Sequence, residues 1–408
     1  MLNPFYLFIA SFSLVIGSYL FGWSSIYPEF SQNTILFFAL IFVLAGFLGY
    51  ITQKTKITKF KKINTTTNIY ILLLGVLVAT LCEGIYSHGF PLLSIAQGQD
   101  SAYTDFGIPV VHVILLTFNA FLTTYIFHLI LSHAKDVQFY IMLALSCIPY
   151  VLEVNRGMFM MVGLNCVSLF LMYIASHIKI RHLVGLLVLA IIALFGFGIM
   201  GNARVNTSYG NGRGPMDSAA ILSIGKATPS FEQSKIPKLL FWGYLYSSSP
   251  IANFQKNVDY RAKKTDDSMI NAKRINHLVF GELMPDFLGK RALDPNEYKS
   301  INIEQITPEL NVGTALSRPM KILGWIGVLS YIIVLFTFGF IYIMILRKLN
   351  SKFTLIGVAT LNTIFILTIY SNMLQATGMS FQLIYPIIFG IYNSFCEYKS
   401  NKFKTLEV

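Results

Sequence analysis

The segment NTILFFALIFVLAGFLGYI, residues 33–51, contains no charged residue and is followed by Lys54, Lys56 and Lys59. A bilayer core about 30 Å thick requires roughly 20 apolar residues in a helix, because every backbone polar group must find its hydrogen-bond partner inside the segment. Residues 33–51 therefore predict a membrane-spanning helix that ends beside a basic loop.

Further apolar segments of this kind recur along the chain, at 4–22, 69–87, 108–131, 138–153, 157–176, 183–201, 321–346, 354–371 and 381–396. The whole sequence is 54% hydrophobic and only 12% charged, which is typical of multi-spanning membrane proteins. We therefore expect an all-α polytopic protein with about ten transmembrane helices. Residues 138–153 form the shortest segment, and with its neighbour it could make a re-entrant pair in place of two crossings.

The basic residues follow every second segment, which predicts the orientation of the chain. These loops hold Lys54, Lys56, Lys59, Lys61 and Lys62, then Lys135, then Lys179 and Arg181, then Arg347, Lys348 and Lys352, and finally Lys399, Lys402 and Lys404. By the positive-inside rule both termini are cytoplasmic. The net charge of +12 is spread over these loops and not gathered on one stripe, so we expect no nucleic-acid partner.

One long polar interval, residues 202–320, holds 15 of the 31 Lys and Arg residues and 11 of the 19 Asp and Glu residues. We expect it to be a large outer loop domain between an N-terminal bundle of about seven helices, residues 1–201, and a C-terminal bundle of about three helices with a tail, residues 321–408. Within the interval, residues 206–215 predict an irregular loop. Residues 236–255 predict a helix at the membrane interface or along a groove, with aromatic residues at 241–246 that contact sugars or lipid headgroups.

No nucleotide, serine-hydrolase, zinc-protease or CxxC motif occurs, and the four cysteines have no metal-type spacing. We therefore expect no cofactor and no metal, and a substrate that is already activated.

Arginines at the outer helix ends and in the large loop predict an anion site for a lipid-linked phosphate or pyrophosphate, because the guanidinium fork grips phosphate oxygens. The candidates are Arg156, Arg204, Arg213, Arg274 and Arg318. Each also has a plainer interpretation. In that interpretation Arg156 anchors a helix end beside Glu153, Arg204 and Arg213 carry incidental charge in a solvated loop, and Arg318 is an ordinary arginine before a membrane span.

His277 shares a helix face with Arg274 and is the candidate general base, because a neighbouring cation lowers the pKa of a histidine and keeps the ring neutral. The alternative is an ordinary surface histidine. Glu83 lies within an apolar segment, near its outer end, where its side chain is expected to reach the interface.

Several short stretches, in this order, resemble the Wzy-type polymerases of O-antigen and other oligosaccharide repeat units. They are GFPLL at 89–93, DFGIPVVH at 105–112, NRGMFMMVGL at 155–164, GNARV at 201–205, YLYSSSPIANF at 244–254 and LGWIGVLSY at 323–331. The resemblance implies a metal-independent glycosyltransferase of the bacterial inner membrane, GT-C-like in architecture, with the large loop in the periplasm. Its donor and acceptor would be undecaprenyl-pyrophosphate-linked oligosaccharides, with membrane lipid and a chain-length regulator as further partners.

Arg156 and Arg204 match the family positions that hold pyrophosphate, whereas Arg213, Arg274 and His277 match only in lying in the large loop. Glu153 is a second candidate for the catalytic base, with Asp286 as a further substitute. Two other activities remain open at this stage: an O-antigen ligase, and a transporter or flippase for a lipid-linked glycan. Nearly uncharged span centres disfavour the flippase.

Overall fold

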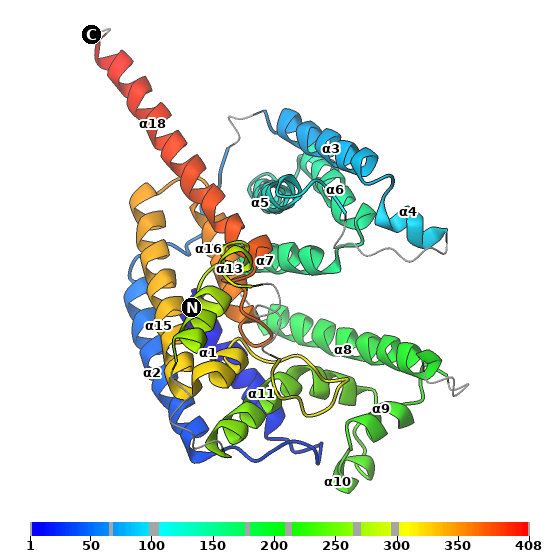
Figure 1. The fold of residues 1–408 in the computed structure, drawn as a ribbon. Helices are drawn as coiled ribbons and strands as arrows, with labels where there is room; N and C mark the ends of the chain where they lie inside the picture. Colours follow the sequence, from blue (N-terminus) through cyan, green and yellow to red (C-terminus); the bar gives the residue numbers. More distant parts are fainter. Residues whose placement is uncertain are drawn as a thin grey trace.

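The computed structural model describes residues 2–64, 68–97, 106–175, 180–208, 214–263, 271–294 and 302–406. Helices account for the regular structure of these ranges, apart from an isolated bridge between Ser24 and Ala227. Figure 1 shows the helices packed around one another, with the C-terminal helix projecting from the bundle. The all-α class is confirmed.

A helix lies at each of the ten predicted spans. They are α1 (Pro4–Tyr19), α2 (Gln32–Gln53), α3 (Ile69–Tyr86), α5 (Val111–Ser132), α6 (Val137–Leu152), α7 (Arg156–Ile174), α8 (Ile180–Ser208), α15 (Ser317–Leu349), α16 (Thr354–Leu367) and α18 (Ile384–Leu406). Among the described residues, α2, α3, α5, α7 and α15 are long and apolar enough to cross a membrane, and α1, α6 and α16 are shorter apolar helices. These apolar helices indicate a membrane protein, and the number of ten membrane crossings remains a prediction.

The main core lies where α1 packs against α2, α11 (Leu240–Lys263) and α16. Phe5 is fully buried, and its ring meets those of Phe336 and Phe365 edge to face at centroid distances of 5.6 and 5.4 Å. This arrangement sets the positive ring edge against the negative ring face. The first helix is therefore a central element of the core.

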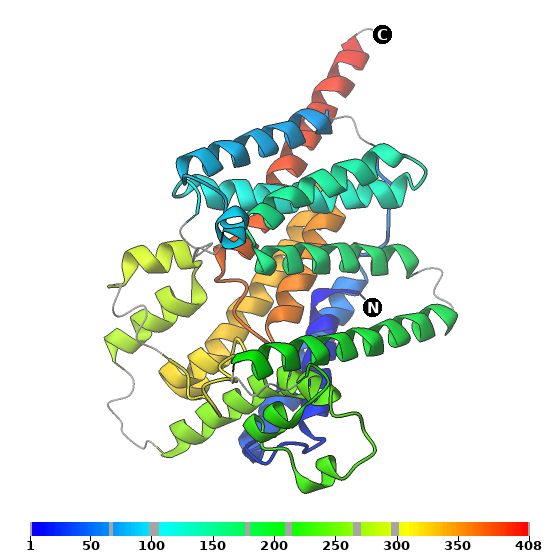
Figure 2. The same cartoon turned by 90° about the vertical axis from the view of Figure 1, so that its right-hand side faces the viewer.

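A second core is formed by α3, α5 and α6, and it also includes Phe353, whose ring packs against that of Phe389. Within it, the amide nitrogen of Asn119 donates to the backbone oxygen of Ser146 at 2.9 Å, which ties α5 to α6. In Figure 2 the helices of this group and α7 lie side by side as roughly parallel rods, with α8 beyond α7.

The helix predicted within residues 236–255 is present as α11, which lies in the core of the bundle, and its place at the membrane interface or along a groove stays a prediction. It packs against α1, α8 and α15. Its aromatic residues Phe241, Trp242 and Tyr244 are buried, and Trp242 donates its indole N–H to Asn202 Oδ1 at 2.7 Å. Gly201 faces the Trp242 ring, and a Cβ there would collide with that ring, so glycine permits the two helices to approach.

The helix α8 extends through Arg204 to Ser208, past the boundary predicted at residue 201. Residues 206–208 of the irregular loop expected at 206–215 are therefore helical, since the helix does not end where the apolar run ends. Further short helices follow: α9 (Ala219–Ile224), α10 (Pro229–Glu232), α12 (Ala272–Leu278), the π-helix η3 (Val279–Leu283) and α13 (Asp286–Ala292). Residues 202–320 as a separate loop domain remain a prediction.

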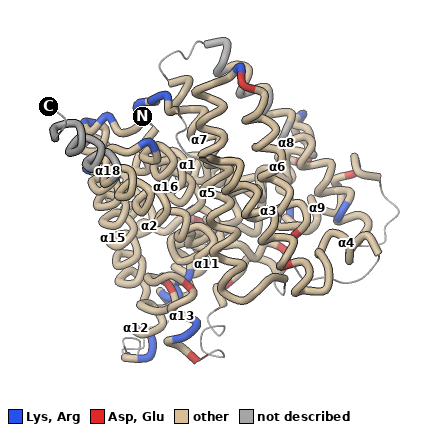
Figure 3. The backbone as a smooth tube through the Cα atoms, turned by 90° about the horizontal axis from the view of Figure 1, so that it is seen from above, with Lys and Arg blue, Asp and Glu red and all other residues tan. Residues whose placement is uncertain are grey.

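We use the term loop end for the end of the bundle where α3, α6 and α8 finish and α5, α7 and α15 begin. Figure 3 shows Lys and Arg near the two chain termini and again near α12 and α13, with mostly uncharged helix between. The charged residues thus border the apolar part of the bundle, as the low dielectric of a bilayer requires.

Candidate functional site

The helix α15 breaks near its start, and this break organises the first cluster of charged side chains. Leu323 and Gly324 depart from helical geometry, with Gly324 at φ +60°. That φ lies in the left-handed region, which glycine adopts without the steric cost of a Cβ. A new helical segment starts after the break, and the start of a helix carries partial positive charge.

Two arginines from different helices lie at this break. Arg261, near the end of α11, rests so close that a Cβ on Gly324 would be 3.4 Å from two of its guanidinium nitrogens. Arg274, on α12, points Nη1 toward the backbone oxygen of Ile322 at 3.4 Å. Burial, together with the neighbouring Arg274, lowers the pKa of Arg261. Among the described residues, no carboxylate forms an ion pair with either guanidinium.

Lys321 adds a further cation beside this pair, but it is already compensated. Its ammonium pairs with Glu304 and lies 3.6 Å from the centre of the Tyr260 ring. Among the described residues, the positive charge without a carboxylate partner at the break therefore belongs to Arg261 and Arg274, and an anionic ligand would satisfy it.

A polar pocket of about 520 Å³ opens beside the start of α15. Its polar lining includes Glu282, Thr314, Ser317, Arg318, Asn372 and Gln375. Glu282, from η3, is buried and lies 3.2 Å from Nη1 of Arg318. Burial raises the pKa of Glu282 to about 7, although Arg318 and a hydrogen bond involving Asn372 lower it in part. A carboxyl that titrates near neutral pH is suited to general acid or base chemistry.

Asp286 is less suited to that role. Its carboxylate accepts hydrogen bonds from Lys290 at 2.6 Å and from the Thr377 hydroxyl. Burial raises the pKa of Asp286, but the bonds from Lys290 and Thr377 outweigh it and hold the pKa below its usual range. A strongly acidic carboxylate is a weak base.

The structure brings three of the sequence candidates to this region. Arg318 lines the pocket, Arg274 lies at the break in α15, and His277 is buried on α12, which packs against α15. The burial of His277 departs from the surface position that was its plainer interpretation. Its assignment as the base stays a prediction.

The other candidates lie elsewhere. Arg156 is exposed at the start of α7, and Arg204 is exposed on the part of α8 that continues past the boundary predicted at residue 201. Among the described residues, neither forms an ion pair or a side-chain hydrogen bond with the arginines at the break. Arg213 lies outside the described residues.

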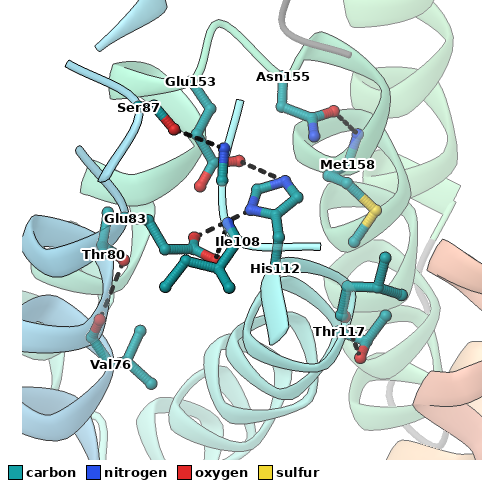
Figure 4. A network of polar contacts seen from close by, with 12 residues as sticks. Val76, Thr80, Glu83, Ser87, Ile108, His112, Thr117, Glu153, Asn155 and Met158 are labelled. Atoms are coloured by element: carbon teal, nitrogen blue, oxygen red, sulfur yellow. Dashed lines mark hydrogen bonds and ion pairs between the residues drawn. The ribbon is translucent and has the colours of Figure 1, made fainter. Parts of the chain in front are cut away.

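Glu153 belongs to a second cluster at the loop end (Figure 4). Glu83 from α3 accepts a hydrogen bond from His112 of α5, at 2.9 Å between Oε2 and Nδ1. On the other side of the ring, Glu153 at the end of α6 places Oε2 3.9 Å from Nε2. The exposed fractions of Glu83 and Glu153 are 1% and 3%, so the expectation that Glu83 reaches the interface was wrong. In the described part of the chain, Glu153 forms no ion pair with Arg156.

Sequence reasoning missed Arg261, Glu282, Glu83 and His112 as site residues. One signal was available for the second cluster, because Glu83, His112 and Glu153 all fall near the same ends of three successive apolar segments. Ionisable residues at one depth in neighbouring membrane helices tend to pair. No comparable signal marks Arg261 or Glu282, because neither lies near the end of a predicted apolar segment.

A basic pocket of about 310 Å³ lies at the opposite end of the bundle, lined by Lys59, Lys61 and Arg347 among others. These residues come from the lysine-rich loops that orient the chain by the positive-inside rule, which explains their charge without a ligand. No protein-family model, curated protein or solved structure matches this chain.

Proposed function

We propose that this protein is a glycosyltransferase that joins undecaprenyl-pyrophosphate-linked oligosaccharide repeat units, as the Wzy-type polymerases do. The observation that carries the proposal is the pair Arg261 and Arg274 at the break in α15, two adjacent guanidiniums without a carboxylate partner in the described chain. Like charges gathered in this way are costly unless an anion joins them. A lipid-linked diphosphate supplies two such negative groups beside a membrane.

The chemistry requires both a stabilised leaving group and an activated acceptor. The acceptor hydroxyl oxygen bonds to the anomeric carbon of the donor glycan, and the bond from that carbon to the diphosphate oxygen breaks. The electron pair of the broken bond goes to the diphosphate. Arg261 and Arg274 stabilise this developing charge more in the transition state than in the ground state.

The proton of the acceptor hydroxyl goes to Glu282, which lines the pocket beside the start of α15. Its pKa of about 7 is matched to a base that works near neutral pH. In this assignment Glu282 replaces His277 and Glu153 as the base, and Arg318 orients its carboxylate. The 520 Å³ pocket has room for sugar hydroxyls among its polar side chains.

The test is reconstitution of the full chain with synthetic lipid-linked repeat units, with product length read on a gel. We expect Arg261→Ala and Arg274→Ala to slow chain growth by about 10²-fold each, on the scale of one lost oxyanion donor. Arg291→Ala is the matched control, because Arg291 is an exposed arginine of the same polar interval. Growth at the wild-type rate in both test variants would refute the proposal.

The same assay separates the rival activities. A chain that passes the glycan only to lipid A core is a ligase, and one that moves the lipid-linked substrate without forming a glycosidic bond is a flippase. With the four native cysteines replaced by serine, labelling of a single cysteine introduced as Lys226→Cys, at an exposed position, tests the proposed periplasmic location. Reaction only after the cytoplasmic face is opened would contradict that location.

A further inference from the structure

The cluster of Glu83, His112 and Glu153 has an imbalance of charge that the rest of the described chain does not correct. Two buried carboxylates flank one imidazole (Figure 4). With both carboxylates ionised, even a protonated His112 leaves one negative charge in excess. A charge held this far from water is strongly disfavoured unless it is compensated.

One atom of the cluster, Oε2 of Glu153, is buried and has no hydrogen-bond partner among the described residues. Its side chain is aimed at Nε2 of His112, but the 3.9 Å between them is too long for a hydrogen bond. The opposite nitrogen, Nδ1, is already held by Glu83 at 2.9 Å.

We propose that a divalent transition-metal cation of the Zn²⁺ type binds between Nε2 of His112 and the carboxylate of Glu153. Imidazole nitrogen and carboxylate oxygen bind Zn²⁺ at about 2.0–2.2 Å, so an ion between the two atoms spans a gap of about 4 Å. The ligand atoms of all three residues lie within 4.8 Å of one another. The added charge of two units balances the two carboxylates.

Glu83 has a different role in this site. With the metal at Nε2, the Nδ1–H of His112 donates to Glu83, which fixes the tautomer and the orientation of the ring. Glu83 is thus a positioning residue, and His112 and Glu153 are the ligands. The His112 side chain is 18% exposed, which leaves a route for the ion and open coordination positions for water or a substrate oxygen.

A bridging water is the alternative occupant of the gap, and it makes the opposite prediction for metal binding. Water supplies hydrogen bonds but no charge, so it leaves the excess negative charge uncorrected. The metal site rests on this cluster alone and does not depend on the proposed glycosyltransferase activity.

The test uses the full chain, purified in nanodiscs through a tag without histidine, with Cys82→Ser in every variant because Cys82 is an exposed thiol beside Glu83. ZnCl₂, MnCl₂, MgCl₂ and CaCl₂ are titrated by calorimetry, and bound metal is counted by elemental analysis after desalting. We expect one Zn²⁺ per chain, bound more tightly than Mg²⁺ or Ca²⁺ because of the imidazole ligand.

The variants should fall into a graded series. His112→Gln and Glu153→Gln lose the bound Zn²⁺, whereas Glu83→Gln weakens binding about 10- to 100-fold, as loss of an orienting partner does. Glu232→Gln, an exposed carboxylate on α10, is the control and keeps wild-type binding. A rise in the unfolding temperature on addition of Zn²⁺, in the protein that keeps Glu83, His112 and Glu153, supports the site even if a ligand variant fails to fold. Absence of stoichiometric binding in that protein, or unchanged binding in His112→Gln and Glu153→Gln, would overturn it.

Discussion

The buried carboxyl of Glu282 should make the stability of this protein fall as pH rises through neutrality. Its pKa is raised from the ordinary value of 4.5 to about 7, first because burial disfavours the ionised form. A carboxyl whose pKa is higher in the folded chain binds its proton more tightly there than in the unfolded chain. The stability that it contributes is therefore complete below pH 4.5 and lost as pH rises toward 7.

The size of this effect follows from the two pKa values. Each unit of pKa difference corresponds to about 1.4 kcal/mol, so the loss between about pH 5 and about pH 8 is about 2 to 3 kcal/mol. For a chain of 408 residues, with an unfolding entropy of about 2 cal/mol/K per residue, this corresponds to about 3 °C in Tm.

Glu282→Gln is the perturbation, because it keeps the shape of the side chain and removes its titration. The variant also loses the ion pair with Arg318, and the pKa of about 7 already includes the effect of that pair. The informative quantity is therefore the change in the Tm difference with pH, and not the Tm difference at one pH. Thermal unfolding of both proteins is followed by intrinsic fluorescence in nanodiscs across these pH values. Their Tm difference should change by about 3 °C toward the variant as pH rises. Glu309→Gln, an exposed carboxylate, should run parallel to wild type. Parallel curves for wild type and Glu282→Gln would refute the buried, proton-binding state of this carboxyl.

Three further changes test other parts of the molecule. Gly324→Ala forces an L-residue into φ +60° beside Arg261 and should reduce the free energy of unfolding by about 1 to 2 kcal/mol, measured by chemical denaturation; wild-type stability would contradict the left-handed break. Phe5→Ala empties a fully buried site and should cost about 3 to 5 kcal/mol in the same measurement, whereas an effect under about 1 kcal/mol would place Phe5 outside the core. Arg156→Ala and Arg204→Ala should each leave the protein inserted and keep long polymer ladders, because these exposed residues lie away from Arg261 and Arg274. Collapse of the ladder to a single repeat in either variant would show that the pyrophosphate is held there and not at the break in α15.

The long helices were predictable because their signal is local. In a bilayer, an apolar run such as residues 33–51 has no water to bond its backbone N–H and C=O groups. Each run must therefore form its own hydrogen bonds as a helix. The burial of helices outside the apolar runs has no such local signal. Residues 240–263 are only partly apolar, and their burial depends on the helices α1, α8 and α15 that surround them.

By itself, the sequence determined the helical class, the positions of the apolar helices and the presence of arginines between them. Tertiary structure decided which charges meet: Arg261 with Arg274, Glu282 with Arg318, and Glu83 with His112. The physical reason is that a charge interacts with whatever lies within a few ångströms of it, and those neighbours come from different helices. Hydropathy indicates which segments are apolar enough to form membrane helices, and only packing decides which side chain a residue faces.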